Sequence, residues 1–242
     1  MNWKKDLREK DDAVSPVIAL MLILAILATC MAVYTTTYVP GLKQQDEITH
    51  SGEVKLAFER FASDIDNVIA QGKPAVYTEV LELGGGDVPL SPTKSSGTVE
   101  INTTVIGNYT IGSETKNLYG IEISYLPSFT AWEKQGYLYK NGVVWITKDE
   151  KKTPAMLTLY TVEDGKNREK EVLQKWYHAS SVIIPNFTVV ENKAEITGTS
   201  AVKLRLNATL GDKMTNVKVK LNGDAEKTYT NARLLNIEVS VE

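Results

Sequence analysis

Hydrophobic and polar positions divide the chain into stretches of different character, beginning with a sharp boundary near the start. Residues 1–12 are rich in charge, whereas residues 13–42 contain no charged residue at all. The hydrocarbon core of a bilayer is about 30 Å thick, and about 20 apolar helical residues cross it. Residues 13–42 are therefore long enough for one transmembrane helix, and everything after them is too polar for a second.

An amphipathic pattern follows the uncharged stretch. Apolar residues recur there at steps of mostly three or four, as on one face of an α-helix. The members of this stripe are Ile48, Val54, Phe58, Phe61, Ile65 and Val68. We predict a stalk helix over residues 43–72 that Gly72 and Pro74 bring to an end. We also expect Pro40 and Gly41 to break or kink the helix ahead of it.

Residues 73–242 have the pattern of short β-strands separated by turns. The predicted strands are residues 76–83, 98–106, 118–126, 137–140, 143–147, 156–162, 182–190, 202–206, 217–221, 227–230 and 234–241. Asn141-Gly142 and Asn222-Gly223 are strong hairpin signals, and only residues 166–178 suggest a helix. The predicted fold class is α+β: a long hydrophobic helix, an amphipathic stalk helix and an antiparallel β-sandwich-like head.

Composition narrows the possible functions. The 242 residues are 43% hydrophobic and 24% charged with a net charge of −3, which are ordinary values for a folded domain. A chain so near neutrality has no basic patch for nucleic acid, so we expect no DNA or RNA partner. The single cysteine, Cys30, lies in the uncharged stretch, so the head must fold without a disulfide.

Basic residues flank the uncharged stretch unequally. Lys4, Lys5, Arg8 and Lys10 precede it, and Lys43 is the first basic residue after it. Basic residues are retained on the cytoplasmic side of a membrane helix. The N-terminus is therefore expected inside the cell, and residues 73–242 outside.

Residues 11–20 carry a more specific motif, Asp-Asp-Ala-Val-Ser-Pro-Val-Ile-Ala-Leu. This string resembles the N-terminal segment of archaeal type IV pilin-like proteins, in which a charged residue precedes A/G-V-S-P-V-I-G. Ala19 stands where that family usually has glycine, and one methyl group is expected to tighten helix packing rather than abolish it. Pro16 falls in the first helical turn, where its missing N–H is tolerated.

The resemblance implies a class III signal peptide over residues 1–12, cut by a prepilin peptidase, and a retained helix over residues 13–42. The implied processing region is Lys10, Asp11, Asp12 and Ala13, and the implied assembly helix begins with Val14, Ser15, Pro16, Val17 and Ile18. It further implies a pilin or minor pilin of an extracellular filament. The implied partners are the membrane, other pilin subunits, an assembly ATPase and a polytopic membrane protein.

Three other interpretations of the N-terminus remain open. The helix can be a plain single-pass anchor for a surface binding or adhesion protein that never polymerises. An ordinary signal peptide can be cut among the small residues around Cys30. Cys30 itself, preceded by Leu27-Ala28-Thr29, loosely resembles a lipid-attachment site. The position of the cut distinguishes these interpretations from prepilin processing.

The sequence offers no catalytic motif. His50 and His178 are far apart, and with Cys30 in the uncharged stretch no His/Cys zinc set exists. No nucleophile elbow, zinc-protease or phosphate-loop motif is present. The three glycines at 84–86 lead to Pro89 rather than to a helix, which indicates a turn. We expect no enzymatic activity, no cofactor and no metal.

Two further groups of residues concern the head. Four N-x-S/T sequons, at Asn102, Asn108, Asn186 and Asn207, lie in or beside predicted strands, where each is either glycosylated or unmodified. Four aromatic residues, Trp132, Tyr137, Tyr139 and Trp145, surround the predicted 141–142 hairpin. We interpret them as cross-strand packing in preference to a ligand-binding surface.

Overall fold

A computed structural model describes residues 15–85, 88–89, 91, 93–149, 151–155, 168–178, 183–190 and 194–242. The helical elements are α1 (Ser15–Val33), the π-helical segment η1 (Tyr34–Tyr38), α2 (Val39–Gln71) and α3 (Arg168–His178). The strands are β1 (Ala75–Glu82), β2 (Ser96–Ile111), β3 (Glu114–Ser128), β4 (Gly136–Lys140), β5 (Val143–Lys148), β6 (Lys151–Pro154), β7 (Ile183–Val189), β8 (Glu195–Gly198), β9 (Ala201–Leu221) and β10 (Lys227–Val241). The fold class is α+β, with a long N-terminal helix followed by a mostly antiparallel sheet.

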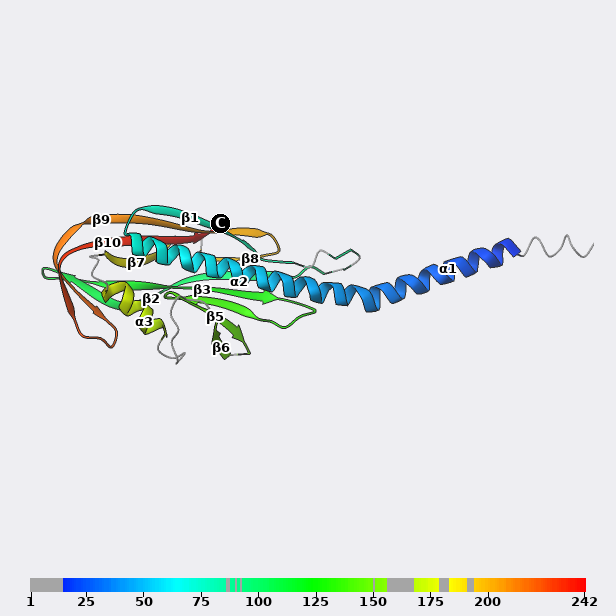
Figure 1. The fold of residues 1–242 in the computed structure, drawn as a ribbon. Helices are drawn as coiled ribbons and strands as arrows, with labels where there is room; N and C mark the ends of the chain where they lie inside the picture. Colours follow the sequence, from blue (N-terminus) through cyan, green and yellow to red (C-terminus); the bar gives the residue numbers. More distant parts are fainter. Residues whose placement is uncertain are drawn as a thin grey trace, which may run out of the picture.

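The long helix continues through Pro40, so it does not break there, but it bends where α1 passes into α2 through η1 (Figure 1), which is the kink that the sequence predicted as the alternative. The π-helical segment η1 immediately precedes the proline, and the N–H of Val39 donates to the carbonyl of Tyr34, five residues back. A proline ring normally collides with the carbonyl four residues before it. A wider π turn at that point carries the helix past the proline. The hydroxyl groups of Thr35 and Thr36 also donate to carbonyls of the preceding turn, at 3.0 and 2.7 Å.

The end of α2 agrees with the prediction from sequence. Gly72 adopts a left-handed conformation (φ 57°), and its N–H donates to the carbonyl of Val68 at 2.9 Å. Glycine is favoured at this position because it has no Cβ to clash.

The ten strands belong to one hydrogen-bonded sheet. Its main path runs β6-β5-β4-β3-β2-β9-β10-β7, with β1 paired to β9 and β8 paired to β2. All pairs are antiparallel except β10 with β7. Strand β9 pairs with β1 near its start and with β2 near its end, so this one strand links the two parts of the sheet.

Several predicted strands are shorter than those observed. Strand β9 joins the predicted strands 202–206 and 217–221, because the polar residues between them also hydrogen-bond to β10. Strand β10 likewise joins 227–230 to 234–241. The four-residue strands β6 and β8 were not predicted, since each is short and mostly polar. The predicted strand 156–162 lies outside the described residues.

The Asn141-Gly142 hairpin forms as predicted, between β4 and β5. Both residues have positive φ, 45° and 88°, as a tight hairpin turn requires. A side chain at Gly142 would meet Val172 and Trp176 of α3 at 2.3 and 2.8 Å. Glycine therefore serves both the turn and the close approach of α3.

The hydrophobic core lies between α2 and the sheet. From α2 it takes Val54, Phe58, Phe61, Ile65 and Val68, all almost fully buried. Ile48 was predicted to begin this stripe, but it is exposed, and polar residues occupy the buried face upstream of Val54.

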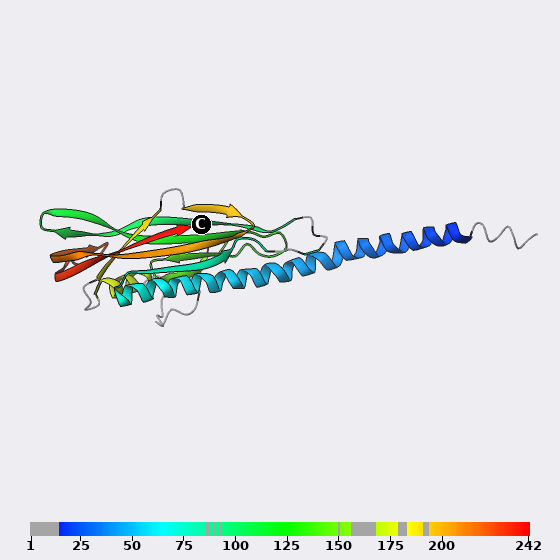
Figure 2. The same cartoon turned by 90° about the horizontal axis from the view of Figure 1, so that it is seen from above.

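Figure 1 shows α1 projecting away from the strands, whereas α2 lies alongside them. Seen from above, α2 lies along one flank of the strands (Figure 2). The molecule is thus a helical rod of which only the second part is attached to the head.

Candidate functional site

Helix α1 exposes apolar side chains on every side. Every residue from Pro16 to Val33 is exposed, including Leu20, Leu24 and Leu27. A helix of 19 residues is about 28 Å long, close to the thickness of a bilayer core. Among the described residues, the helix that begins here is the one that is long and apolar enough to cross a membrane.

The predicted assembly residues lie at the start of this helix. Helix α1 begins at Ser15, and Pro16, Val17 and Ile18 form its exposed first turn. The processing region Lys10 to Ala13, together with Val14, lies outside the described residues. Cys30 is exposed farther along α1.

Helix α2 has a buried polar row upstream of its apolar stripe. The row consists of Lys43, Glu47, His50 and Ser51, each no more than 5% exposed. These residues continue the three- and four-residue spacing of the apolar stripe, so they lie on the same helix face. Each one contacts a segment of the head.

The first two members of the row bind loop segments. The Lys43 ammonium donates to the carbonyl and the hydroxyl of Thr93, both at 2.7 Å. The Glu47 carboxylate accepts hydrogen bonds from the Ser95 hydroxyl at 2.5 Å and from the N–H groups of Thr130 and Ala131 at 2.9 and 2.8 Å. Two separate loops of the head are thereby attached to one turn of α2.

The environment of Glu47 favours its charged form. Burial raises the pKa of this carboxyl, but the hydrogen bonds from Ser95, Thr130 and Ala131 act in the opposite direction and together hold the pKa below its usual value. A carboxylate that accepts several backbone N–H bonds is strongly stabilised. Glu47 is therefore a buried, ionised attachment point.

The other two members of the row bind tyrosines of the sheet. His50 Nε2 lies 3.0 Å from the hydroxyl of Tyr125, which donates to the carbonyl of Leu83 at 3.1 Å. Ser51 Oγ lies 2.9 Å from the hydroxyl of Tyr137. Burial lowers the pKa of His50, although Glu53 and Asp46 oppose that shift. His50 thus acts as a neutral hydrogen-bonding group at neutral pH.

A second polar contact lies near the other end of α2. Trp176 of α3 donates from Nε1 to Asp66 Oδ1 at 3.2 Å. Burial raises the pKa of Asp66 to about 6, and the hydrogen bond from Trp176 only partly opposes it. Asp66 titrates within an ordinary experimental pH range.

The four sequons differ in exposure. Asn102 on β2 is exposed, and its amide donates to Glu100 at 2.7 Å. Asn108 and Asn207 are half-buried, and the half-buried Asn186 accepts the Tyr119 N–H at 3.0 Å. Glycosylation stays a prediction at all four, with Asn102 the most accessible.

Three of the four aromatic residues around the hairpin are buried, as the predicted cross-strand packing requires. Tyr137, Tyr139 and Trp145 are buried against apolar neighbours, and Trp132 is half-buried. Within the described ranges, no three His, Cys, Asp or Glu side chains gather as a metal site would require.

Sequence reasoning missed the buried polar row. The available signal was its spacing, since positions 43, 47, 50 and 51 continue the face that Val54 and Phe58 begin. The burial of these positions was not predicted, because charged and polar residues on an amphipathic helix normally face water.

Comparison with protein-family models, with curated proteins and with solved structures finds no match to this chain.

Proposed function

We propose that this protein is a structural subunit, a pilin or minor pilin, of an archaeal type IV pilus-like surface filament. The observation that carries the proposal is helix α1, which is apolar on every side and exposes every residue from Pro16 to Val33. Soluble monomers rarely expose so large a continuous apolar surface. Either lipid or other copies of the same helix would cover it.

The attachment of α2 supports a role in assembly. Because the polar row and the apolar stripe hold α2 against the head, α1 extends as a continuation of a fixed rod. Moving α1 from lipid into a bundle of identical helices exchanges one apolar environment for another, and helix packing then adds van der Waals contact.

In this proposal the leader before Ala13 is removed by a prepilin peptidase, and an assembly ATPase with a polytopic membrane protein adds the subunit to the filament. The head, proposed to be sandwich-like, faces outward and determines the surface properties of the filament. Catalysis is no part of this role.

A non-polymerising surface protein anchored by the same helix is the second candidate. The observation that favours it is the length of α1, about 28 Å, which suffices to span a bilayer and is followed by the polar-tipped residues of η1. A single membrane-spanning helix is sufficient to anchor a surface protein that does not polymerise.

Intact mass and N-terminal sequencing of the protein from its native membrane test the proposal. A mature N-terminus between Asp11 and Val14 with α1 retained is the expected result. An intact Met1 would favour the anchored candidate instead. A start between Cys30 and Val33 would remove most of α1 and overturn both candidates.

A further inference from the structure

The head contains a cleft that is far along the chain from α1 and plays no part in the proposed assembly. Its volume is about 750 Å³, in the upper part of the range for small-molecule sites. Strands β2, β4, β5 and β6, helix α3 and the turn after β9 all contribute to its walls. Segments far apart in the sequence thus converge on one cavity.

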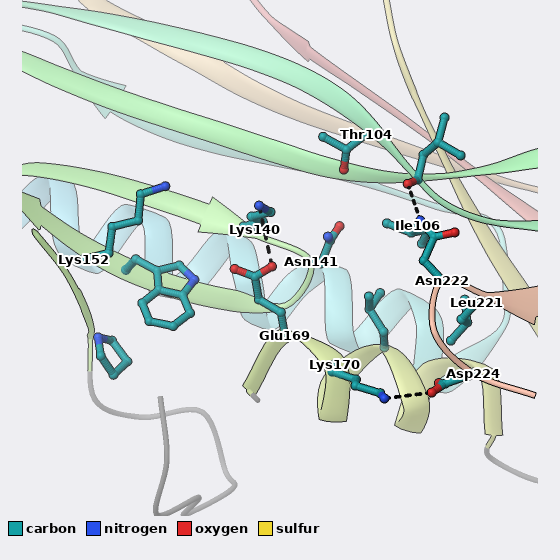
Figure 3. Close-up of a pocket in the computed structure, with 14 residues that line it drawn as sticks. Thr104, Ile106, Lys140, Asn141, Lys152, Glu169, Lys170, Leu221, Asn222 and Asp224 are labelled. Atoms are coloured by element: carbon teal, nitrogen blue, oxygen red, sulfur yellow. Dashed lines mark hydrogen bonds and ion pairs between the residues drawn. The ribbon is translucent and has the colours of Figure 1, made fainter. Parts of the chain in front are cut away.

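Ion pairs line the cleft. Lys140 lies 3.7 Å from Glu169 and 3.6 Å from Glu122, and Lys170 lies 3.0 Å from Asp224. Figure 3 shows the pairs Lys140–Glu169 and Lys170–Asp224 at the same cavity. These side chains are anchored by one another, so their hydrogen-bonding groups are already oriented before a ligand arrives.

Among the described residues, the charges at the cleft balance once Glu122, which pairs with Lys140 from outside the lining, is included. Lysines 140, 152 and 170 line it, and the carboxylates of Glu122, Glu169 and Asp224 lie beside them. An anionic ligand would meet the carboxylates, and a cationic ligand would meet the lysines. A neutral ligand rich in hydroxyl groups can donate to the carboxylates and accept from the ammonium groups at the same time.

The remaining wall is largely apolar and includes one unsatisfied donor. Ile106, Leu173 and Leu221 supply aliphatic surface suited to the C–H faces of a sugar ring. Trp145, only 8% exposed, lines the cleft, and within the described residues its buried Nε1 has no hydrogen-bond partner. A buried N–H without a partner costs about 1–3 kcal/mol, and a ligand hydroxyl would remove that cost where the side chains that close Nε1 from solvent give way to the ligand.

We infer that this cleft binds a neutral oligosaccharide. The paired carboxylates and lysines would bond its hydroxyl groups, the aliphatic wall would contact its ring faces, and Trp145 Nε1 would donate to one oxygen. The inference does not depend on filament assembly, because an anchored monomer would present the same cleft.

The test uses the full-length protein in lipid nanodiscs and a panel of small probes. Maltotriose, cellotriose, mannotriose and chitotriose are the neutral probes, with 3′-sialyllactose as the acidic sugar and a neutral tripeptide as the peptide probe. Saturation-transfer NMR detects contact, and calorimetric titration gives Kd. We expect at least one neutral trisaccharide to bind more tightly than the acidic sugar and the tripeptide.

Two variants connect binding to the cleft. Glu169→Gln removes one charged acceptor, and Trp145→Phe removes Nε1 while keeping a ring; each should weaken binding about tenfold. Glu226→Gln is the matched control, since Glu226 pairs with Lys218 at 3.3 Å outside the cleft, and it should leave Kd unchanged. Unfolding temperatures verify that each variant is folded.

Three results would overturn the inference. The first is no binding of any neutral trisaccharide at about 10 mM, a concentration that detects even millimolar Kd values. The second is tighter binding of the acidic sugar or the tripeptide. The third is equal binding by folded Glu169→Gln, Trp145→Phe and the control.

Discussion

The two parts of the long helix differ in what surrounds them. Helices α1 and α2 are joined through η1 into one continuous helix. The residues of α1 are nevertheless exposed from Pro16 to Val33, whereas α2 buries one face from Val39 to Ile69. Uniform hydrophobicity leaves α1 no preferred side, while the sided pattern of α2 selects the head as its partner. The apolar face of α2 is therefore buried within the molecule, whereas the apolar surface of α1 needs lipid or other protein chains to cover it.

The largest expected effect is on the free energy of unfolding, which truncation in α2 should lower and truncation in α1 should not. Phe61→Ala in α2 removes a side chain only 1% exposed, and such truncations cost about 3–5 kcal/mol. Leu27→Ala in α1 should leave the unfolding of the head unchanged, because Leu27 is 59% exposed. Denaturant unfolding of both variants in detergent measures the contrast, and equal destabilisation would show that α1 also packs on the head.

Membrane retention should show the opposite pattern. Leu24→Lys places a charge near the middle of α1, at a cost of roughly 3–4 kcal/mol relative to leucine in a bilayer. The matched variant Leu56→Lys alters an exposed leucine of α2 and should be tolerated. Carbonate extraction of membranes measures both. If only Leu56→Lys lost membrane retention, α2 and not α1 would be the segment in the membrane.

The polar row should contribute nearly as much as one core aromatic residue. Glu47→Ala leaves the buried Ser95 hydroxyl and the N–H groups of Thr130 and Ala131 without their acceptor, so we expect a loss of about 3 kcal/mol. Glu53→Ala, on the exposed face of the same helix, should change stability by less than about 0.5 kcal/mol. Thermal unfolding compares the two variants, and a small effect of Glu47→Ala would mean that water replaces its contacts.

The smallest effect concerns pH. Because the pKa of Asp66 is raised to about 6 in the folded protein, the folded state binds more protons than the unfolded state between about pH 4 and 6. This contribution to stability is greatest below pH 4 and is lost as pH rises through 6, a change of about 2–3 kcal/mol.

Asp66→Asn keeps an oxygen for Trp176 Nε1 and should flatten that part of the profile. Chemical denaturation at several pH values measures the slope. An unchanged slope in Asp66→Asn would assign the titration to another group, such as Asp64, whose pKa burial also raises.

Local patterns in the sequence predicted those elements whose structure depends on local chemistry. Gly72 ended α2 and Asn141-Gly142 formed a hairpin, because both need only a backbone conformation that these residues favour. The π-helical segment that carries the helix past Pro40 was not predicted, because it has no clear sequence signal. Burial of Glu47 was missed because its partners, Ser95, Thr130 and Ala131, are 48 to 84 residues away.

The cleft was missed for the same reason. Lys170 and Asp224 meet only because α3 and the turn after β9 adjoin in the folded head. The spacing of these residues in the sequence gives no sign that they are in contact. Asp66 and Trp176 are likewise 110 residues apart.

The arrangement of the polar row also has a mechanical consequence. Its four residues span positions 43 to 51, about 12 Å along the axis of α2, and each is bonded sideways to the head. A pull along the rod loads these bonds in parallel, whereas a sideways pull from the Gln71 end would load the contacts of α2 one after another. We expect single-molecule pulling to need much greater force lengthwise than sideways, which would let tension on α1 reach the head without detaching it.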